Sequence, residues 1–221
     1  MTIVSRSYEE GCIAAHALDL IGDRWALLVV RELMLGPRRF GALRRGMPGI
    51  SANILTRRLT ELEAQGILTR RMLPPPADLA VYELTAAGLA LWPVLRALCL
   101  WGAAQPGHDP KQFISPAALM LSMAATWVAG APDLSAGFDL AGDSFRVTIA
   151  AGRYHVARAA AEGVDLQFGG TPNALAAVIY GPVPLTGHLS AGTLAFAGPV
   201  DLGQRFIDGF ALRREPAAPP F

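Results

Sequence analysis

The chain has 221 residues, of which 52% are hydrophobic and 17% charged, so it holds enough apolar side chains to bury a core. No apolar run approaches the roughly 20 residues that span a bilayer, and the N-terminus lacks the pattern of a signal peptide. Two cysteines cannot form a disulfide framework. We therefore expect a cytoplasmic protein of one large or two small domains, without membrane insertion.

Catalytic and metal-binding motifs are not recognisable in the sequence. The four histidines are scattered, no Cys/His cluster has metal-ligand spacing, and no GxxxxGK[ST] phosphate loop is present. We expect a protein that is not an enzyme and that uses neither a metal nor another cofactor.

Charge is distributed unevenly along the chain. Residues 1–104 carry a net charge of +3 and residues 105–221 one of −2, and within 38–71 eight arginines accompany only two acidic residues. A concentrated positive patch of this kind is typical of a protein that binds a polyanion. The alternative is an ordinary solvated surface in an arginine-rich protein.

Apolar residues at helical spacing predict two helices between residues 12 and 36. The first covers 12–21, and the second follows a capping Asp23 and ends at Gly36. Their expected buried residues are Ile13, Ala17, Leu20 and Ile21, then Trp25, Leu28, Val29 and Leu33.

A winged helix-turn-helix is predicted from the next segments. A short helix with Phe40 and Leu43 inward precedes a helix over 51–65, which Ser51 caps and whose leucines recur at i, i+4 and i+7. Strand-like segments 67–73 and 79–84 flank "PPPAD" and predict a hairpin with a stiff, exposed tip. Thr85 is expected to cap a last apolar helix.

In a winged helix the second helix of the turn motif enters the DNA major groove. Here that helix is 51–65, and Asn and Arg form bidentate hydrogen bonds with adenine and guanine. The residues expected near base edges are Ser51, Asn53, Thr56 and Arg57. Those expected on the sugar-phosphate backbone are Arg38, Arg39, Arg44, Arg45 and Arg58, with Arg70 and Arg71 of the hairpin on a phosphate or the minor groove.

Residues 12–104 resemble the HxlR (MarR-like) family of bacterial regulators. The resemblance is carried by the spacing from Cys12 to Trp25 and by "GPRRFGAL", "PGIS" and "LTRRLTELEAQGIL". It implies a dimeric winged-helix transcription factor on a pseudo-palindromic operator of double-stranded DNA. The positions that match the family's dimer contacts are the 12–21 helix and Leu89, Trp92, Leu95, Leu98 and Trp101, which the alternative places in the core of one chain.

Cys12 matches a position at which members of this family sense oxidants or electrophiles. A helix start favours the thiolate, and His16 lies one turn further on, whereas Glu9 and Glu10 disfavour an anion. The alternative is a small residue packed at the dimer interface. Cys99, on an apolar helix, is expected to be inert.

The second half of the chain is predicted to be α+β with an antiparallel sheet. Residues 105–114 have the composition of a linker, and Ser115 caps the helix that begins the domain at 115–221. Strands are expected at 144–150, 153–159 and 164–170, and another within "GTLAFAG". Helices are expected after the Thr171 cap and in "VDLGQRFIDGF".

Residues 115–212 resemble a sterol carrier protein 2-like domain, in the order strand, helix at "GTPNAL", G-x-L-x-F-x-G and final helix. The resemblance implies an apolar tunnel for a lipid-like or other hydrophobic effector, although each lining position taken singly suits a core residue. The expected lining residues are Met120, Met123, Trp127, Phe145, Tyr154, Phe168, Phe196 and Phe206. A lipid carrier that uses the winged domain only to dimerise is the alternative function.

Overall fold

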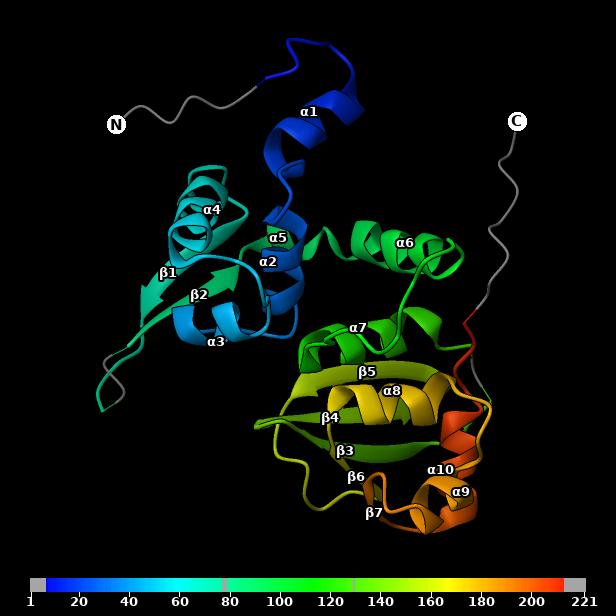
Figure 1. Cartoon of the computed structure of the whole chain (residues 1–221). Coiled ribbons are helices and arrows are strands. Elements are labelled where there is room, and N and C mark those ends of the chain that lie inside the picture. Colours follow the sequence, from blue (N-terminus) through cyan, green and yellow to red (C-terminus); the bar gives the residue numbers. More distant parts are fainter. Residues whose placement is uncertain (1–6, 77–78, 129, 213–221) are drawn as a thin grey trace. The chain divides into compact units, whose positions relative to one another are not determined.

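A computed structural model describes residues 7–76, 79–128 and 130–212 of the chain (Figure 1). The chain divides into two compact units, residues 1–95 and 96–221, and the division falls inside helix α6 (Trp92–Ala103). The expected domain boundary at residue 104 lies at the end of this helix. The assignment of 105–114 as a linker stays a prediction.

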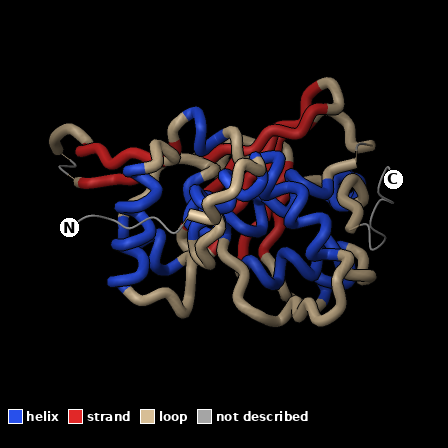
Figure 2. Tube along the Cα trace, turned by 90° about the horizontal axis from the view of Figure 1, so that it is seen from above, coloured by secondary structure: helices blue, strands red, loops and turns tan. Residues whose placement is uncertain are grey.

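The first unit has the element order expected of a winged helix. Its helices are α1 (Ile13–Ile21), α2 (Ala26–Leu33), α3 (Phe40–Arg45), α4 (Ala52–Ala64) and α5 (Ala86–Leu89). Its strands β1 (Leu68–Met72) and β2 (Ala80–Leu84) pair antiparallel, from Leu68 opposite Leu84 to Met72 opposite Ala80. Figure 2 shows these two strands side by side and extending beyond the helices of their unit. Part of the expected hairpin tip, residues 77–78, lies outside the described residues.

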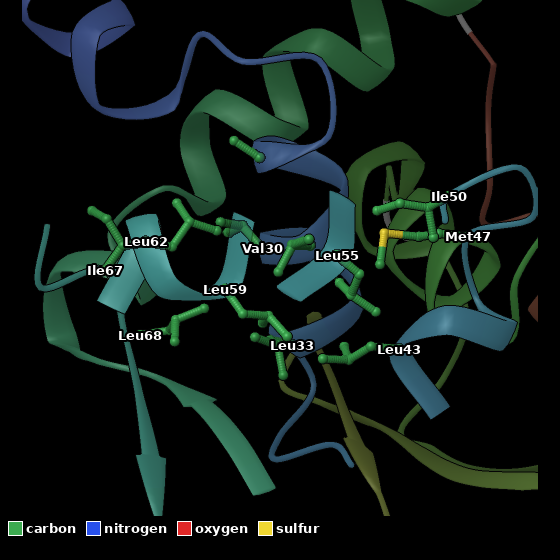
Figure 3. Close-up of a cluster of buried hydrophobic side chains, with 12 residues drawn as sticks. Val30, Leu33, Leu43, Met47, Ile50, Leu55, Leu59, Leu62, Ile67 and Leu68 are labelled. Atoms are coloured by element: carbon green, nitrogen blue, oxygen red, sulfur yellow. The ribbon is translucent and has the colours of Figure 1, made fainter. Parts of the chain in front are cut away.

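The leucine stripe of α4 forms the centre of this unit's core, as predicted. Leu55, Leu59 and Leu62 are buried and face Val30 and Leu33 of α2 (Figure 3). Ser51 caps α4, since its hydroxyl oxygen accepts a hydrogen bond from the Ile54 N–H at 3.2 Å. Burying these side chains fixes which side of α4 remains on the surface.

Two expectations for the helices of this unit are wrong. In α1 the expected inward residues Ile13 and Ala17 are exposed, because the helix packs through Ala15 and Ile21 instead. Asp23 does not cap α2, whose N-cap is Trp25.

The last apolar helix is interrupted between α5 and α6. Pro93 has no N–H to donate to the carbonyl of Leu89, which explains the break at that point.

The second unit is a sheet with order β5-β4-β3-β6-β7 and helices on one face. Its strands are β3 (Leu134–Leu140), β4 (Asp143–Ala150), β5 (Arg153–Arg158), β6 (Leu166–Gly170) and β7 (Ala195–Ala197). Its helices are α7 (Pro116–Thr126), α8 (Pro172–Tyr180), α9 (Leu185–Ser190) and α10 (Val200–Ile207), and Figure 1 shows α7 and α8 side by side across the sheet. Ser115 and Thr171 cap α7 and α8 as predicted.

The sheet is mixed, which corrects the expectation of an antiparallel one. The central strand β3 was not predicted, although its buried Leu134, Ala136, Phe138 and Leu140 alternate with Ser135, Gly137 and Asp139, because Gly and Asp are uncommon inside strands. β3 pairs antiparallel with β4 and parallel with β6. The chain reaches β6 by crossing over β3, where the carbonyl of Ala161 lies against Gly137 and leaves no room for a side chain.

Candidate nucleic-acid interface

Helices α3 and α4 and the turn between them form a helix-turn-helix. The turn runs through Gly46 and Gly49, and Gly49 has a φ of +93°, which a residue with a side chain rarely adopts. Ile50 closes the turn by entering the core, and Ser51 begins α4. The two helices are therefore joined by a short, well-packed connection, as in proteins that place the second helix in the major groove.

The side of α4 away from the core carries the residues expected at base edges. Asn53, Thr56 and Arg57 are exposed. Ser51 is also exposed, but its hydroxyl is occupied by the cap. The side chain of Arg57 is 68% exposed, and its Nε lies 2.8 Å from Oε1 of Glu61, one turn further along the helix. These residues present hydrogen-bonding groups of the kinds that recognise adenine and guanine.

The arginines before the turn surround the start of the motif. Arg39 is the N-cap residue of α3, and Arg44 and Arg45 are exposed in the last turn of that helix. Arg38 is half-buried, and its N–H and C=O exchange hydrogen bonds of 2.9 and 2.8 Å with Tyr82. The segment before α3 thus pairs with β2 and ties the arginines to the wing.

The two wing arginines are exposed but differ in their contacts. Arg71 forms an ion pair with Glu83, with 2.8 Å between its Nε and the Oε2 of Glu83. The side chain of Arg70 has solvent access, while its backbone N–H donates to Oε1 of Glu63 at 3.0 Å. That hydrogen bond links α4 to β1 and fixes the position of the wing relative to the helix.

Arg58 is not placed to contact a phosphate. Its side chain is 10% exposed, and its guanidinium pairs with Asp23 and, at 2.7 Å, with Glu61. The helical rotation of about 100° per residue places it towards α1 rather than on the outer side. In this structure Arg58 is a positioning residue of α4, which corrects its expected role.

A buried carboxylate beneath the motif was not found from the sequence. Glu32 on α2 is 0% exposed, and its Oε1 lies 2.9 Å from Nη2 of Arg31. The same Nη2 lies 3.4 Å from the carbonyl oxygen of Gly46, at the end of α3. A single Glu in an apolar helix carries no pattern, so only the tertiary contact identifies it as the link between α2 and the turn.

The thiols of Cys12 and Cys99 lie in environments that shift their pKa values in opposite directions. Cys12 is exposed at the N-terminus of α1, where the backbone N–H groups of Ala15 and then Ala14 lower the pKa of its thiol. Burial raises the pKa of Cys99, against the opposing effect of Arg96. The exposure and lowered pKa of Cys12 favour the sensing alternative over packing, and the raised pKa of Cys99 agrees with the expected inert thiol, while redox sensing itself stays a prediction.

Most of the side chains expected to line a tunnel in the second unit fill its core instead. Met120, Met123, Phe145, Phe168 and Phe206 are each 0% exposed. The rings of Phe168 and Phe206 lie 5.8 Å apart, and both also contact Phe138. These side chains pack against one another and exclude solvent, as a large buried aromatic cluster does.

The remaining expected residues lie at two places. Trp127 and Tyr154 have ring centroids 5.8 Å apart, and both contact Phe210. Phe196 and Phe168 border an open hollow of about 700 Å³ on the sheet, together with Asp139 and Gln167. The eight residues therefore do not surround one common space in the part of the chain that the structure describes.

A group of hydroxyls lies between α7, α8 and β5. The hydroxyl oxygen of Tyr180 lies 2.9 Å from Oγ of Ser122 and 3.0 Å from Oγ1 of Thr126, and burial raises the pKa of Tyr180 to about 12. The hydroxyl of Tyr154 is buried without a hydrogen-bond partner among the described residues, and burial raises its pKa well above the ordinary value. An unpaired buried hydroxyl favours a bound water or ligand group at this point.

The described ranges contain no metal-type cluster of side chains and one apolar stretch of membrane-spanning length. No group of three or more His, Cys, Asp or Glu side chains in them is placed to hold a metal ion. One stretch in them, Ala86–Ala103, is long and apolar enough to cross a membrane by length and composition, and 6% of it is buried. This stretch is longer than any apolar run that was expected from the sequence.

A three-helix core, a helix-turn-helix and a two-stranded wing with exposed arginines define a winged-helix protein of the DNA-binding class. The HxlR-like helix-turn-helix family matches residues 20–109, and the chain belongs to this family.

The relatives of known name are HTH-type transcriptional regulators. One from Synechocystis sp. is 42% identical over 87 residues, which are 39% of this chain and 64% of that protein. One from Methanothermobacter thermautotrophicus is 37% identical over 98 residues, covering 44% of this chain and 75% of the relative. Among solved structures, the reduced form of the transcriptional regulator YodB from B. subtilis is 34% identical, covers 45% of this chain and all of that one, and has a TM-score of 0.40.

Proposed function

We propose that the protein is a non-catalytic, cytoplasmic transcriptional regulator that binds double-stranded DNA through α4 and the wing. The observation that carries this proposal is the exposed side of α4 with Asn53, Thr56 and Arg57, preceded in the chain by exposed arginines of α3 and followed by those of β1. Side chains that hydrogen-bond to base edges are thus accompanied by side chains suited to phosphates, as sequence-specific binding requires.

The experiment is a DNA titration with the full chain. A duplex selected from a library randomised over about 30 base pairs, roughly three helical turns, supplies the specific probe, and a random duplex of equal length the control. Affinity should fall steeply as salt rises, because each phosphate contact releases counterions. Affinity that does not depend on salt, or equal affinity for both duplexes, would contradict the proposal.

Two arginines distinguish base recognition from backbone binding. Arg57→Ala should reduce the preference for the selected duplex, by about tenfold for the loss of one bidentate contact. Arg71→Ala should weaken binding to both duplexes alike and make the salt dependence shallower, because a phosphate contact carries no sequence information. Fluorescence anisotropy at several salt concentrations measures both quantities. Equal losses on the two duplexes for Arg57→Ala would remove that residue from base recognition.

The proposed active form is a homodimer on a pseudo-palindromic site. Support comes from apolar side chains that the described chain leaves exposed on α1 and α6, namely Ile13, Leu18, Val94, Leu98 and Trp101. Val94, Leu98 and Trp101 follow one another at i, i+4 and i+7, so they share one side of α6. A second copy of the chain would cover such a side, and it would place two α4 helices on one duplex.

We further propose that a hydrophobic small molecule bound to the second unit modulates DNA binding. The order β6, α8, β7, α10, with α9 inserted before β7, agrees with the order that the resemblance to sterol carrier protein 2-like domains implies, and the unpaired hydroxyl of Tyr154 supports a bound polar group. Native mass spectrometry of the purified protein tests this proposal. A dimer with a bound small molecule is expected, whereas a ligand-free dimer that no hydrophobic compound stabilises would contradict it.

The lowered pKa and exposure of Cys12 favour a second mode of control, oxidation of that thiol. Cys12→Ser should then abolish any change in DNA affinity caused by an oxidant while leaving the affinity of the reduced protein unchanged. An oxidant effect that persists in Cys12→Ser would contradict this mode.

A further inference from the structure

An ion-pair chain connects the turn after α1 with the exposed Arg57. Asp23 pairs with Arg58, Arg58 lies 2.7 Å from Oε2 of Glu61, and Oε1 of Glu61 lies 2.8 Å from Nε of Arg57. The side chains of Arg58 and Glu61 are 10% and 13% exposed, whereas those of Asp23 and Arg57 are 60% and 68% exposed. One nearly buried carboxylate thus joins two guanidinium groups.

We infer that Glu61 is a specificity-determining positioning residue that holds the guanidinium of Arg57 ready for a guanine. This inference rests on the proposed DNA-binding function. Because Glu61 engages Nε, the two terminal Nη groups of Arg57 remain available, and paired N–H donors suit the O6 and N7 acceptors of guanine. Fixing a long, exposed side chain beforehand removes part of the entropy cost of binding.

Arg58 and Asp23 hold Glu61 in place. Without Arg58, the Glu61 side chain is free to adopt other rotamers, and an exposed i, i+4 pair with Arg57 contributes little by itself. Arg58 is fixed in turn by Asp23, in the turn between α1 and α2, beside a hollow of about 720 Å³ that Asp19, Leu18 and Gln65 also line. The orientation of Arg57 therefore depends on residues well removed from the DNA-facing side of α4.

Glu61→Gln is the decisive variant, because it removes the negative charge and replaces one of the two oxygens that contact Arg57 and Arg58 by an NH2 group, which cannot accept from a guanidinium. The matched control is Glu63→Gln, on the same helix and with the same change of charge. The carboxylate of Glu63 accepts from the Arg70 N–H at 3.0 Å, and a glutamine oxygen can still do so.

The measurement uses the full chain, the DNA duplex selected by the wild-type protein and a random duplex of equal length, at one salt concentration. Glu61→Gln should lower the ratio of the two affinities about tenfold, and its affinity for random DNA should stay equal or rise, since a negative charge is lost. Glu63→Gln should change the ratio less than about twofold. Retained binding to random DNA shows that the variant is folded.

A double-mutant cycle with Arg57 separates positioning from a purely structural role. In an Arg57→Ala background, Glu61→Gln should not lower the ratio further. An additional loss in that background, or a Glu61→Gln ratio equal to that of Glu63→Gln, overturns the inference alone. A wild-type protein with no preference for any selected duplex overturns the proposed function as well.

Discussion

At the scale of single residues, the helix-turn-helix depends on the absence of a side chain at Gly46. Its φ of −72° is accessible to any residue, so conformational freedom does not explain this glycine. A Cβ there would overlap the carboxylate of Glu32, which is fully buried. The close approach of Glu32 thus determines which residue ends α3.

Gly46→Ala should therefore destabilise the protein by about 1–3 kcal/mol, the usual cost of overpacking a core. Gly41→Ala is the control, because a Cβ at that exposed position of α3 would meet only Nη1 of Arg45, at 3.8 Å. Alanine should be neutral or stabilising there, since it is the better helix former. Urea unfolding followed by tryptophan fluorescence measures both. A Gly46→Ala protein as stable as Gly41→Ala would show that Glu32 can move aside.

The two cysteines should differ in their reaction with iodoacetamide as pH is raised. The thiolate reacts, so the lowered pKa of Cys12 increases its reactive fraction below the ordinary thiol pKa, and the raised pKa of Cys99 decreases it. Peptide mass spectrometry should show the labelling midpoint of Cys12 at lower pH than that of Cys99. Cys12→Ser and Cys99→Ser identify the two sites, and the reverse order would show that a partner covers Cys12.

At the scale of secondary-structure elements, the crossover over β3 determines the topology of the second unit. The chain leaves β5, passes Gly137 on the outer side of the sheet and enters β6 parallel to β3. Only a residue without a Cβ allows the carbonyl of Ala161 to approach β3 so closely. This contact places β6 beside β3 rather than beside β5.

Gly137→Ala should consequently lower the free energy of unfolding by about 1–3 kcal/mol. Gly169→Ala, on the neighbouring strand β6, is the matched control, because a Cβ there would meet only the Cβ of Ala195 at 3.4 Å, an ordinary contact. Both variants replace a strand glycine by alanine, so the difference isolates the overlap with Ala161. Equal stability of the two in urea would show that the crossover segment is free to shift.

At the scale of the whole molecule, the expected homodimer depends on the exposed apolar side of α6. Leu98→Glu would place an unpaired charge in the proposed dimer interface and should raise the dissociation constant of the dimer at least about 100-fold. Arg96→Glu, on the opposite side of the same helix, should leave the dimer intact. Size-exclusion chromatography with light scattering distinguishes the two. A Leu98→Glu protein that remains dimeric would exclude this side of α6 from the interface.

The amino-acid sequence by itself determined the elements whose signals are local. The Ser51, Ser115 and Thr171 caps, the leucine stripe of α4 and the order of helices and wing strands are confirmed, because each depends on residues within a few positions of one another. The same local signals, with the arginines around α4, led to the winged helix and its family.

Strand pairing, buried charges and core packing depend on residues that are distant in the sequence, so they are evident only in the tertiary structure. The alternating pattern of β3 is interrupted by Gly137 and Asp139, which are uncommon inside strands, and its parallel pairing with β6 is made across the crossover. Arg58 looks like a surface residue in the sequence, yet its ion pair with Asp23 keeps it inside, and Glu32 is buried beside Gly46 of the turn. The aromatic residues of the second unit fill its core because their final neighbours come from β3, β6 and α10 together. Each of these features results from packing between residues that are far apart in the sequence.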